Sequence, residues 1–252
     1  MTQPRLSRDH SSTSSAAFYL EARNLTKSYK GKPEPAVLDC SLTVAPGELI
    51  AVVGHNGAGK STLFDILGGL TRPDSGEIMS RINTVDIGWC PQREIIDWSL
   101  TVSQNISLGL DIRRPTSRAE RAKSVAELAG ALGLSNYLNQ TAETLSGGEL
   151  RRTQIARAMA GDPYLMILDE PTTGLDPAGI RVVFEYLERR RAEGASALIS
   201  THETSRFSAY CSRVIAIRKG QIIVDEPVEV FMSHASKSDD LWDAYEALAQ
   251  EQ

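Results

Sequence analysis

Short apolar runs separated by glycine and proline turns dominate the first part of the chain. The runs at residues 18–29, 36–44 and 48–54 are rich in β-branched and aromatic residues, which predicts a small antiparallel layer leading into a buried strand. Further apolar runs at residues 164–168 and 197–200 alternate with a helical stretch at residues 178–191, as expected for parallel strands under crossover helices. The pattern therefore predicts an α/β fold with a mostly parallel sheet and an antiparallel β layer at the N-terminal side.

Two further stretches have helical character. We expect a helix at residues 60–70 and a helical insertion at residues 101–134 that is interrupted at Pro115. Residues 214–218 and 221–224 are expected to form two short strands around Lys219-Gly220. Three units follow from this reading. They are a polar, Ser-rich, disordered leader at residues 1–16, a main domain at 17–230 with a helical subdomain at about 95–160, and an acidic helical tail at 231–252.

Composition and charge exclude several classes of protein. Of the 252 residues 41% are hydrophobic, enough to fill a core, yet no run is long and apolar enough to cross a bilayer and the N-terminus does not resemble a secretory signal, so we expect a cytoplasmic chain. The net charge of -5 comes from the tail, and the nearly neutral remainder argues against a nucleic-acid groove. Cys40, Cys90 and Cys211 are far apart, so we expect buried thiols without disulfides or zinc.

A complete phosphate-binding loop follows the predicted strand at residues 48–54. Its glycines allow backbone N–H groups to turn inward, and the next helix presents its positive end to the phosphates. We expect Lys60 to contact the outer phosphates and the Ser61 hydroxyl to bind Mg2+. The predicted nucleotide-binding residues are Gly54, His55, Asn56, Gly57, Ala58, Gly59, Lys60, Ser61 and Thr62.

Two carboxylates, a histidine and a glutamine follow other apolar strands. Asp169 and Glu170 end one such strand, which would bring them to the carboxyl edge of the sheet beside the phosphate loop. Asp169 is suited to hold Mg2+, and Glu170 to polarise the water that attacks the γ-phosphate. His202 could donate a hydrogen bond to a phosphate oxygen, and Gln92 could touch Mg2+ or the attacking water.

A second glycine-rich helix start lies far beyond the phosphate loop, at Ser146, Gly147, Gly148 and Glu149. The chain therefore has two segments that are suited to bind the phosphates of a nucleotide. The second is most easily explained if it serves a nucleotide bound to another copy of the domain.

The order of these motifs resembles the nucleotide-binding subunit of ATP-binding cassette (ABC) transporters over residues 18–230. The resemblance implies the ABC ATPase fold with a P-loop NTPase core, ATP and Mg2+ as cofactors, and hydrolysis of ATP. It also implies that Tyr29 stacks on adenine; an aromatic residue near the end of a first strand commonly belongs to the core, but its position before the phosphate loop favours stacking. Gln92 would sense a membrane subunit, and His202 would be the switch histidine. Asp176, in the segment Gly174-Leu175-Asp176, would belong to a dimer-contact loop.

In this family two copies close head to tail, with each ATP held by the phosphate loop of one copy and the Ser146-Gly147-Gly148 segment of the other. The partners implied are a second copy or a homologous cassette and an integral membrane permease, with no nucleic acid. The chain would then sit at the inner face of the cell membrane through its permease. Two readings apply to Ile95, Ile96, Trp98 and Leu100, which contact the permease or fill the core of the helical insertion.

Two departures from the family pattern stand out. Position 149 is Glu where Gln is usual, which we expect to tune activity, and residues 76–92 are short, which trims the antiparallel layer. The phosphate loop and residues 97–106 resemble those of single-cassette exporters more than those of sugar or amino-acid importers. Metal importers can share a similar segment after Gln92, so import of a metal or small solute stays the alternative. A non-transport ABC ATPase usually has tandem cassettes or long coiled-coil insertions. A small-molecule kinase would leave residues 145–149 and His202 unexplained, and a regulatory module would lack Glu170 or His202.

Overall fold

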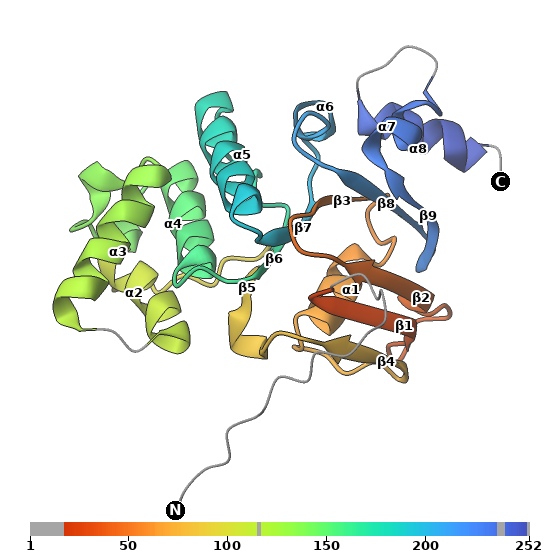
Figure 1. Ribbon diagram of the computed structural model, residues 1–252, viewed down its shortest axis with the longest axis horizontal. Coiled ribbons are helices and arrows are strands. Elements are labelled where there is room, and N and C mark those ends of the chain that lie inside the picture. Colours follow the sequence, from red (N-terminus) through yellow and green to blue (C-terminus); the bar gives the residue numbers. More distant parts are fainter. Residues whose placement is uncertain (1–17, 115–116, 236–239, 251–252) are drawn as a thin grey trace, which may run out of the picture.

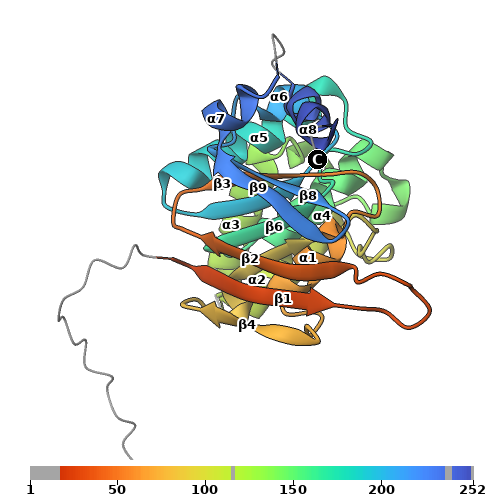
Figure 2. The same ribbon diagram turned by 90° about the vertical axis from the view of Figure 1, so that its right-hand side faces the viewer.

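A small antiparallel sheet forms one layer of the protein. The computed structural model describes residues 18–114, 117–235 and 240–250. Within them, β1 (Leu20–Lys27) lies between β2 (Val37–Val44) and β4 (Ser75–Ser80), and both pairings are antiparallel. Figure 2 shows this sheet below the main one. The predicted antiparallel layer is confirmed.

The main sheet of the described residues has six strands and carries the second layer. Its first five strands in the spatial order are parallel, and the last pairs antiparallel with its neighbour. Every residue of the strands numbered 3, 6 and 7 is buried, which explains why their sequences are continuously apolar. In spatial order the strands are β5 (Ile87–Cys90), β6 (Leu165–Asp169), β7 (Ser196–Ser200), β3 (Leu49–Val53), β8 (Arg213–Arg218) and β9 (Gln221–Pro227).

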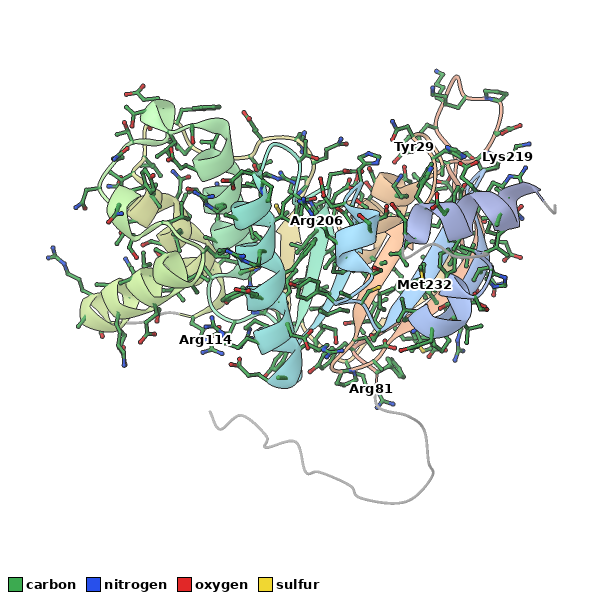
Figure 3. All side chains as sticks on the ribbon, turned by 90° about the horizontal axis from the view of Figure 1, so that it is seen from above. Tyr29, Arg81, Arg114, Arg206, Lys219 and Met232 are labelled. Carbon is green, nitrogen blue, oxygen red and sulfur yellow. The ribbon has the colours of Figure 1, made fainter. Side chains whose placement is uncertain are left out.

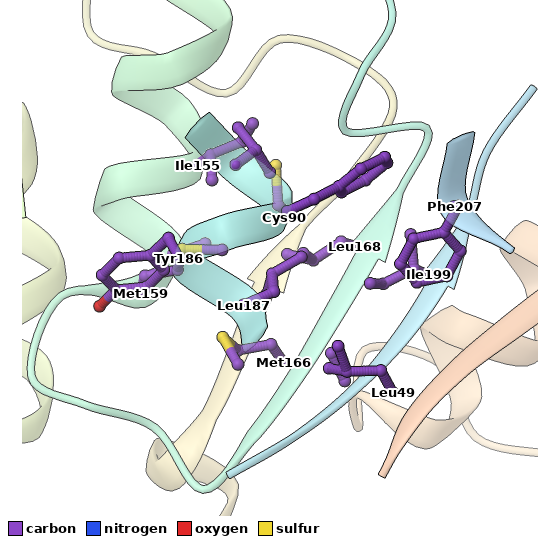
Figure 4. Close-up of a cluster of buried hydrophobic side chains, with 14 of the residues drawn as sticks. Leu49, Cys90, Ile155, Met159, Met166, Leu168, Tyr186, Leu187, Ile199 and Phe207 are labelled. Carbon is purple, nitrogen blue, oxygen red and sulfur yellow. The ribbon is translucent and has the colours of Figure 1, made fainter. Parts of the chain in front are cut away.

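Helices cover both faces of the main sheet, and alternate strand residues face opposite cores. In β3, Ile50 and Val52 pack with α1 (Lys60–Leu67) and the antiparallel sheet, whereas Leu49 and Ala51 belong to the core beneath α5 (Pro177–Ala192). Figure 4 shows the second core, where side chains of α4, α5 and the strands meet. The α/β fold with a mostly parallel sheet is confirmed.

A group of helices lies beyond the β5 edge of the main sheet (Figure 1). It contains α2 (Val102–Arg113), α3 (Arg118–Ala131) and α4 (Gly147–Met159), with short 3-10 turns at Ser135–Tyr137 and Ala142–Thr144. Each of the three helices begins with a capping box, in which the N-cap hydroxyl and the side chain three residues later satisfy each other's backbone N–H. The predicted break at Pro115 lies outside the described residues.

The C-terminal part adds three helices among the described residues: α6 (Thr204–Phe207), α7 (Val228–Met232) and α8 (Leu241–Gln250). The predicted leader at residues 1–16 lies outside the described residues, and the domain boundaries stay predictions. No helix that the structure describes is both long and apolar enough to cross a bilayer.

Two predicted element lengths are wrong. The helix expected at residues 60–70 ends at Leu67, because Gly68 caps it and Gly69 adopts a φ of +75°. The strand expected at residues 221–224 continues to Pro227, where it pairs with β8. The three cysteines are buried and free, as expected, and burial raises the pKa of the Cys90 thiol to about 11.

Candidate nucleotide site

Three neighbouring strands deliver the predicted site residues to one edge of the main sheet. The phosphate loop follows β3, Asp169 ends β6 with Glu170 directly after it, and His202 follows β7. These strands are adjacent in the order β6-β7-β3 and parallel, so their carboxyl ends meet. Sites in parallel sheets form at this edge.

Backbone packing makes glycine necessary at two positions of the phosphate loop. Gly54 has a φ of +155°, and a Cβ atom there would lie 2.3 Å from the carbonyl oxygen of Ile217. Gly59 has a φ of +110°, and a Cβ atom there would lie 2.1 Å from the carbonyl oxygen of Ala36. The loop is therefore held between the end of β8 and residue 36, directly before α1 begins at Lys60.

A cavity of about 420 Å³ lies at this edge of the sheet. It brings together residues from the phosphate loop, both carboxylates, Gln92 and His202. The lining residues are Ala36, Asn56, Gly57, Gly59, Lys60, Ser61, Thr62, Gln92, Asp169, Glu170 and His202. Motifs that are far apart in the sequence thus share one concave, mostly polar surface.

The ammonium group of Lys60 is buried within the phosphate loop. It donates hydrogen bonds to the carbonyl oxygens of Gly54 at 2.6 Å and His55 at 3.2 Å. Burial lowers the pKa of Lys60, against the opposing effect of the Glu170 and Asp169 carboxylates. The loop thus holds its cation close to the two acids.

Glu170 occupies a strained and buried position. Its φ is +52°, a region that non-glycine residues seldom adopt, and its backbone N–H donates to the carbonyl oxygen of Ser200 at 3.0 Å. His202 lies beside it, with 3.0 Å between Nε2 and Oε1. Burial raises the pKa of the Glu170 carboxyl, while the charges of His202 and Lys60 oppose the rise. A raised carboxyl pKa in a cavity is typical of a group that accepts a proton.

The oxygen donors in the cavity fit a hard cation such as Mg2+. Ser61, Gln92 and Asp169 offer a hydroxyl, an amide and a carboxylate oxygen, and Asp169 is 3% exposed, with its Oδ1 accepting from the Ser200 hydroxyl at 2.5 Å. Among the residues that the structure describes, no group of three or more His, Cys, Asp and Glu side chains could hold a metal ion. Mg2+ bound together with a nucleotide needs only one or two protein ligands, because phosphate oxygens and waters supply the others.

The second glycine-rich segment lies apart from this cavity. Ser146 and Gly147 are exposed at the start of α4, and they do not belong to the described residues that line the cavity. A Cβ atom on Gly148 would lie 3.6 Å from the carbonyl oxygen of Gly174, so this helix start adjoins the segment at residues 174–176. Asp176 in that segment caps α5 by accepting from the Gly179 N–H at 2.8 Å.

The structure shows a local role for the unusual residue Glu149. Its carboxylate accepts from the Ser146 N–H at 2.7 Å and completes the capping box of α4. Burial acts to raise the pKa of Glu149, but hydrogen bonds from Ser146 and Tyr137 outweigh it, and the pKa lies below its ordinary value. Glu149 is therefore an anion at the helix start, with one oxygen occupied by the backbone.

Arg151 was missed by sequence reasoning and connects three parts of the site. It is 7% exposed, and its guanidinium donates to the carbonyl oxygens of Pro91 at 2.9 Å and of Asp169 and Glu170 at 2.8 Å each. Gln154 and Arg157, further along α4, donate to the carbonyl oxygens of Arg93 at 2.9 Å and Ile95 at 2.7 Å. Side chains of α4 thus hold both the segment after Gln92 and the end of β6 beside Asp169 and Glu170. The available signal was the position of Arg151 two residues after Glu149, the last residue of the glycine-rich segment.

Comparisons with known proteins agree with this geometry. A protein-family model described as ABC transporter matches residues 37–173. The lipopolysaccharide export system ATP-binding protein LptB of Haemophilus influenzae is 34% identical over 225 residues, which cover 85% of this chain and 92% of that protein. The chain belongs to the ABC transporter family. The energy-coupling factor transporter ATP-binding protein EcfA of Methanothermobacter thermautotrophicus is also 34% identical, over 84% of this chain and 72% of that protein.

A solved structure agrees with the fold and the activity of the ABC protein. It is the dimer of an ATP-binding cassette in a post-hydrolysis state with ADP and Pi. It superposes with a TM-score of 0.76 at 27% identity and covers 83% of this chain and 98% of that one. The protein is thus an ATP-binding subunit with the ABC ATPase fold, and it is an ATPase.

Two further predicted regions of the ABC ATPase do not line the nucleotide cavity. Tyr29 is 42% exposed in the turn after β1, 5.9 Å from the Lys27 ammonium measured to its ring centre, and Figure 3 shows it at the end of the molecule that also carries Lys219. In the other region, Ile96 packs with Ala142 and Leu150, whereas Trp98 is 47% exposed. Ile96 therefore fits the interpretation that the segment fills the core of the helical insertion, whereas contact of Trp98 with a permease stays a prediction.

A larger cavity of about 730 Å³ lies between α2, α3 and α5 of the ABC ATPase. Arg114, at its rim, is labelled in Figure 3 on the helical side of the molecule. The described residues that line this cavity include none of the predicted site residues. The larger cavity is therefore not the candidate nucleotide site. We assign the chemistry to the smaller cavity, because the phosphate loop and both carboxylates meet there.

Proposed function

We propose that the protein closes as a head-to-tail dimer over two ATP molecules and thereby drives a substrate through a separate membrane permease. The phosphate loop of one copy and the segment Ser146-Gly147-Gly148-Glu149 of the other would enclose each nucleotide, and Asp176 would lie at the contact. The separation of this segment from the cavity within one chain carries the proposal. A helix start exposed in this way is a ready site for a phosphate of the partner's ATP.

Within each site we assign separate roles to the polar side chains. Residues 54–62 bind the phosphates, and Ser61, Asp169 and Gln92 hold Mg2+, which would neutralise charge on the phosphate oxygens. Glu170 accepts a proton from the attacking water, and His202, 3.0 Å from its carboxylate, keeps that carboxylate aimed. Tyr29, which is exposed in the turn after β1, stacks on the adenine ring.

The permease contact would use the surface that begins after Gln92. Trp98 is exposed in the segment leading into α2, and Leu108 and Ile112, one turn apart on α2, are exposed on the same face. Exposed apolar side chains grouped on one helix and its lead-in are typical of a protein contact. Through the permease, the ATPase would sit at the cytoplasmic face of the cell membrane.

We propose export as the direction of transport. The support is the likeness to LptB, whose name assigns it to an export system and which this chain matches over 92% of that protein's length. Import of a metal or small solute is the alternative that an experiment must exclude, because EcfA, a relative at the same identity, is named for an energy-coupling factor transporter and not for an export system.

The dimer is tested by measuring the solution mass of Glu170→Gln with ATP and with ADP. This variant keeps every phosphate contact and loses only the group that accepts the proton. We expect a dimer with ATP and a monomer with ADP. A monomer in both, together with full ATPase activity in Ser146→Arg, would overturn the shared site.

The transport role is tested by purification of the tagged protein from detergent-solubilised membranes of its own host. We expect a permease with many membrane spans to co-purify, and Trp98→Asp to abolish its recovery. In proteoliposomes an exporter moves its cargo away from the side that holds ATP. Movement toward that side would establish import, and co-purification with ribosomes or DNA alone would support a non-transport ABC ATPase.

A further inference from the structure

The C-terminal helix α8 is part of the core at the nucleotide edge of the sheet. Leu241, Ala244 and Tyr245 are fully buried, and they join the hydrophobic cluster beneath α5. The Tyr245 hydroxyl donates to the carbonyl oxygen of Ile217, the residue whose carbonyl also packs against Gly54. Figure 1 shows α8 beside α7, next to β8 and β9. The helix therefore has a defined position next to the phosphate loop.

Three side chains of α8 surround His55, the second residue of the phosphate loop. The Trp242 ring meets the imidazole edge to face at 5.0 Å between centres, and Tyr245 does so at 5.3 Å. The Glu246 carboxylate lies 3.2 Å from His55 Nε2. Two aromatic rings and a carboxylate of α8 therefore contact the loop whose backbone is expected to bind the phosphates.

The start of α8 also reaches the segment that follows His202. The Asp240 carboxylate accepts from the Thr204 hydroxyl in α6 and from the Trp242 N–H. Trp242 borders a narrow space, too small for a water molecule, together with Gly54, Lys60, Glu170 and His202. One helix therefore contacts both the phosphate loop and the segment that carries His202.

We propose that α8 positions the phosphate loop for ATP, with Trp242 and Glu246 as positioning residues that act through His55. A loop that is ordered before binding loses less conformational freedom when ATP arrives, and this raises affinity without a new contact to the nucleotide. The contact between His55 and Glu246 is partly exposed and adds little to folding stability. We therefore expect the contact to change the affinity for ATP. This inference rests on the proposed role of residues 54–62 in binding the phosphates.

The test measures ATP affinity by calorimetry in Glu170→Gln, which removes hydrolysis from the readout. We expect Trp242→Ala and Glu246→Gln to raise Kd for ATP by about three- to tenfold. Trp242→Phe keeps a ring against His55 and should stay within about twofold of the parent. Glu229→Gln, an exposed acid in the first turn of α7, is the charge-matched control and should not change Kd. With Glu170 restored, Trp242→Ala should raise KM for ATP and leave kcat within about twofold.

A double-mutant cycle decides whether α8 acts through His55. In His55→Ala, the further change Trp242→Ala should leave Kd unaltered. The same loss with and without His55 would overturn the proposal, as would an unchanged Kd in both Trp242→Ala and Glu246→Gln. Lys60→Ala separates the two proposals. If it fails to weaken ATP binding, the proposed nucleotide site is wrong, whereas strong weakening by Lys60→Ala with no effect of the α8 variants contradicts only the role of α8.

Discussion

Glu170 illustrates what a sequence does and does not reveal about a single residue. Its position after an apolar strand predicts that it lies at the sheet edge. The positive φ of Glu170 and its 3.0 Å contact with His202 depend on the pairing of β6 with β7. That pairing cannot be predicted from the sequence next to either residue. Burial and backbone strain at one carboxylate indicate that the fold tolerates a local cost for the sake of chemistry.

For Glu170→Gln we expect ATP hydrolysis to fall by at least about 100-fold, because the proton acceptor is lost while the amide retains the size of the side chain. Kd for ATP should stay within about threefold of that of the parent, since the phosphate loop is untouched. Phosphate release and calorimetric titration check the two values. Hydrolysis above a tenth of the parent rate would remove Glu170 from its assigned role.

Glu149→Gln should tighten the ATP-bound dimer. Glutamine can complete the same capping box, so α4 should start as before, while one negative charge disappears beside the proposed γ-phosphate contact. We expect the dimer dissociation constant, measured by analytical ultracentrifugation in Glu170→Gln with ATP, to fall by about two- to fivefold. Glu149→Ala, which breaks the capping box, is the control, and a looser dimer in Glu149→Gln would contradict the electrostatic argument.

At the scale of elements, the sequence predicted the types of most strands and helices but not how helices reach across the fold. The start of α4 was expected from its glycines. The hydrogen bonds that Arg151, Gln154 and Arg157 make to residues 91–95 join positions about sixty residues apart, and no periodicity encodes such pairs. These hydrogen bonds hold α4 and the segment after Gln92 together, so we expect the two to move as one rigid unit.

Arg151→Gln should loosen this unit. A glutamine can reach only some of the carbonyl groups that the guanidinium now bridges, and buried acceptors without a donor cost about 1–3 kcal/mol. Hydrogen exchange at the backbone amides of residues 92–96 should therefore speed up, and the ATPase rate should drop about tenfold with little change in ATP affinity. Arg181→Gln, on the exposed face of α5, provides the matched control. Unchanged exchange at residues 92–96 would show that α4 does not hold the segment.

For the whole molecule, composition and strand pattern predicted the layers, while the motifs and the family resemblance supplied the expected partners. The strand order β5-β6-β7-β3-β8-β9 and the docking of α8 on His55 were beyond prediction. Both depend on contacts between distant segments, which packing in three dimensions selects. The proposed dimer likewise depends on surfaces that each chain presents to another.

A mixture of two inactive variants should recover activity if sites are shared between copies. In a mixed dimer of Lys60→Ala with Ser146→Arg, one site combines both defects, whereas the other combines an intact phosphate loop with an intact helix start. Random mixing should restore about a quarter of the wild-type sites, measured as ATPase activity of the mixture. A doubly substituted chain mixed with wild type forms no intact mixed site and serves as the control. No recovery in the first mixture would show that each chain completes its own site.

The hydrogen bonds from α4 to residues 91–95 have an evolutionary consequence. Arg151, Gln154 and Arg157 bind carbonyl oxygens there, and every amino acid supplies a carbonyl. The side chains in this stretch can therefore drift and adapt to a different membrane protein while the connection to the ATPase machinery persists. Related proteins that transport different cargo are therefore expected to differ in the outward-facing residues of this stretch and to retain the three donors on α4.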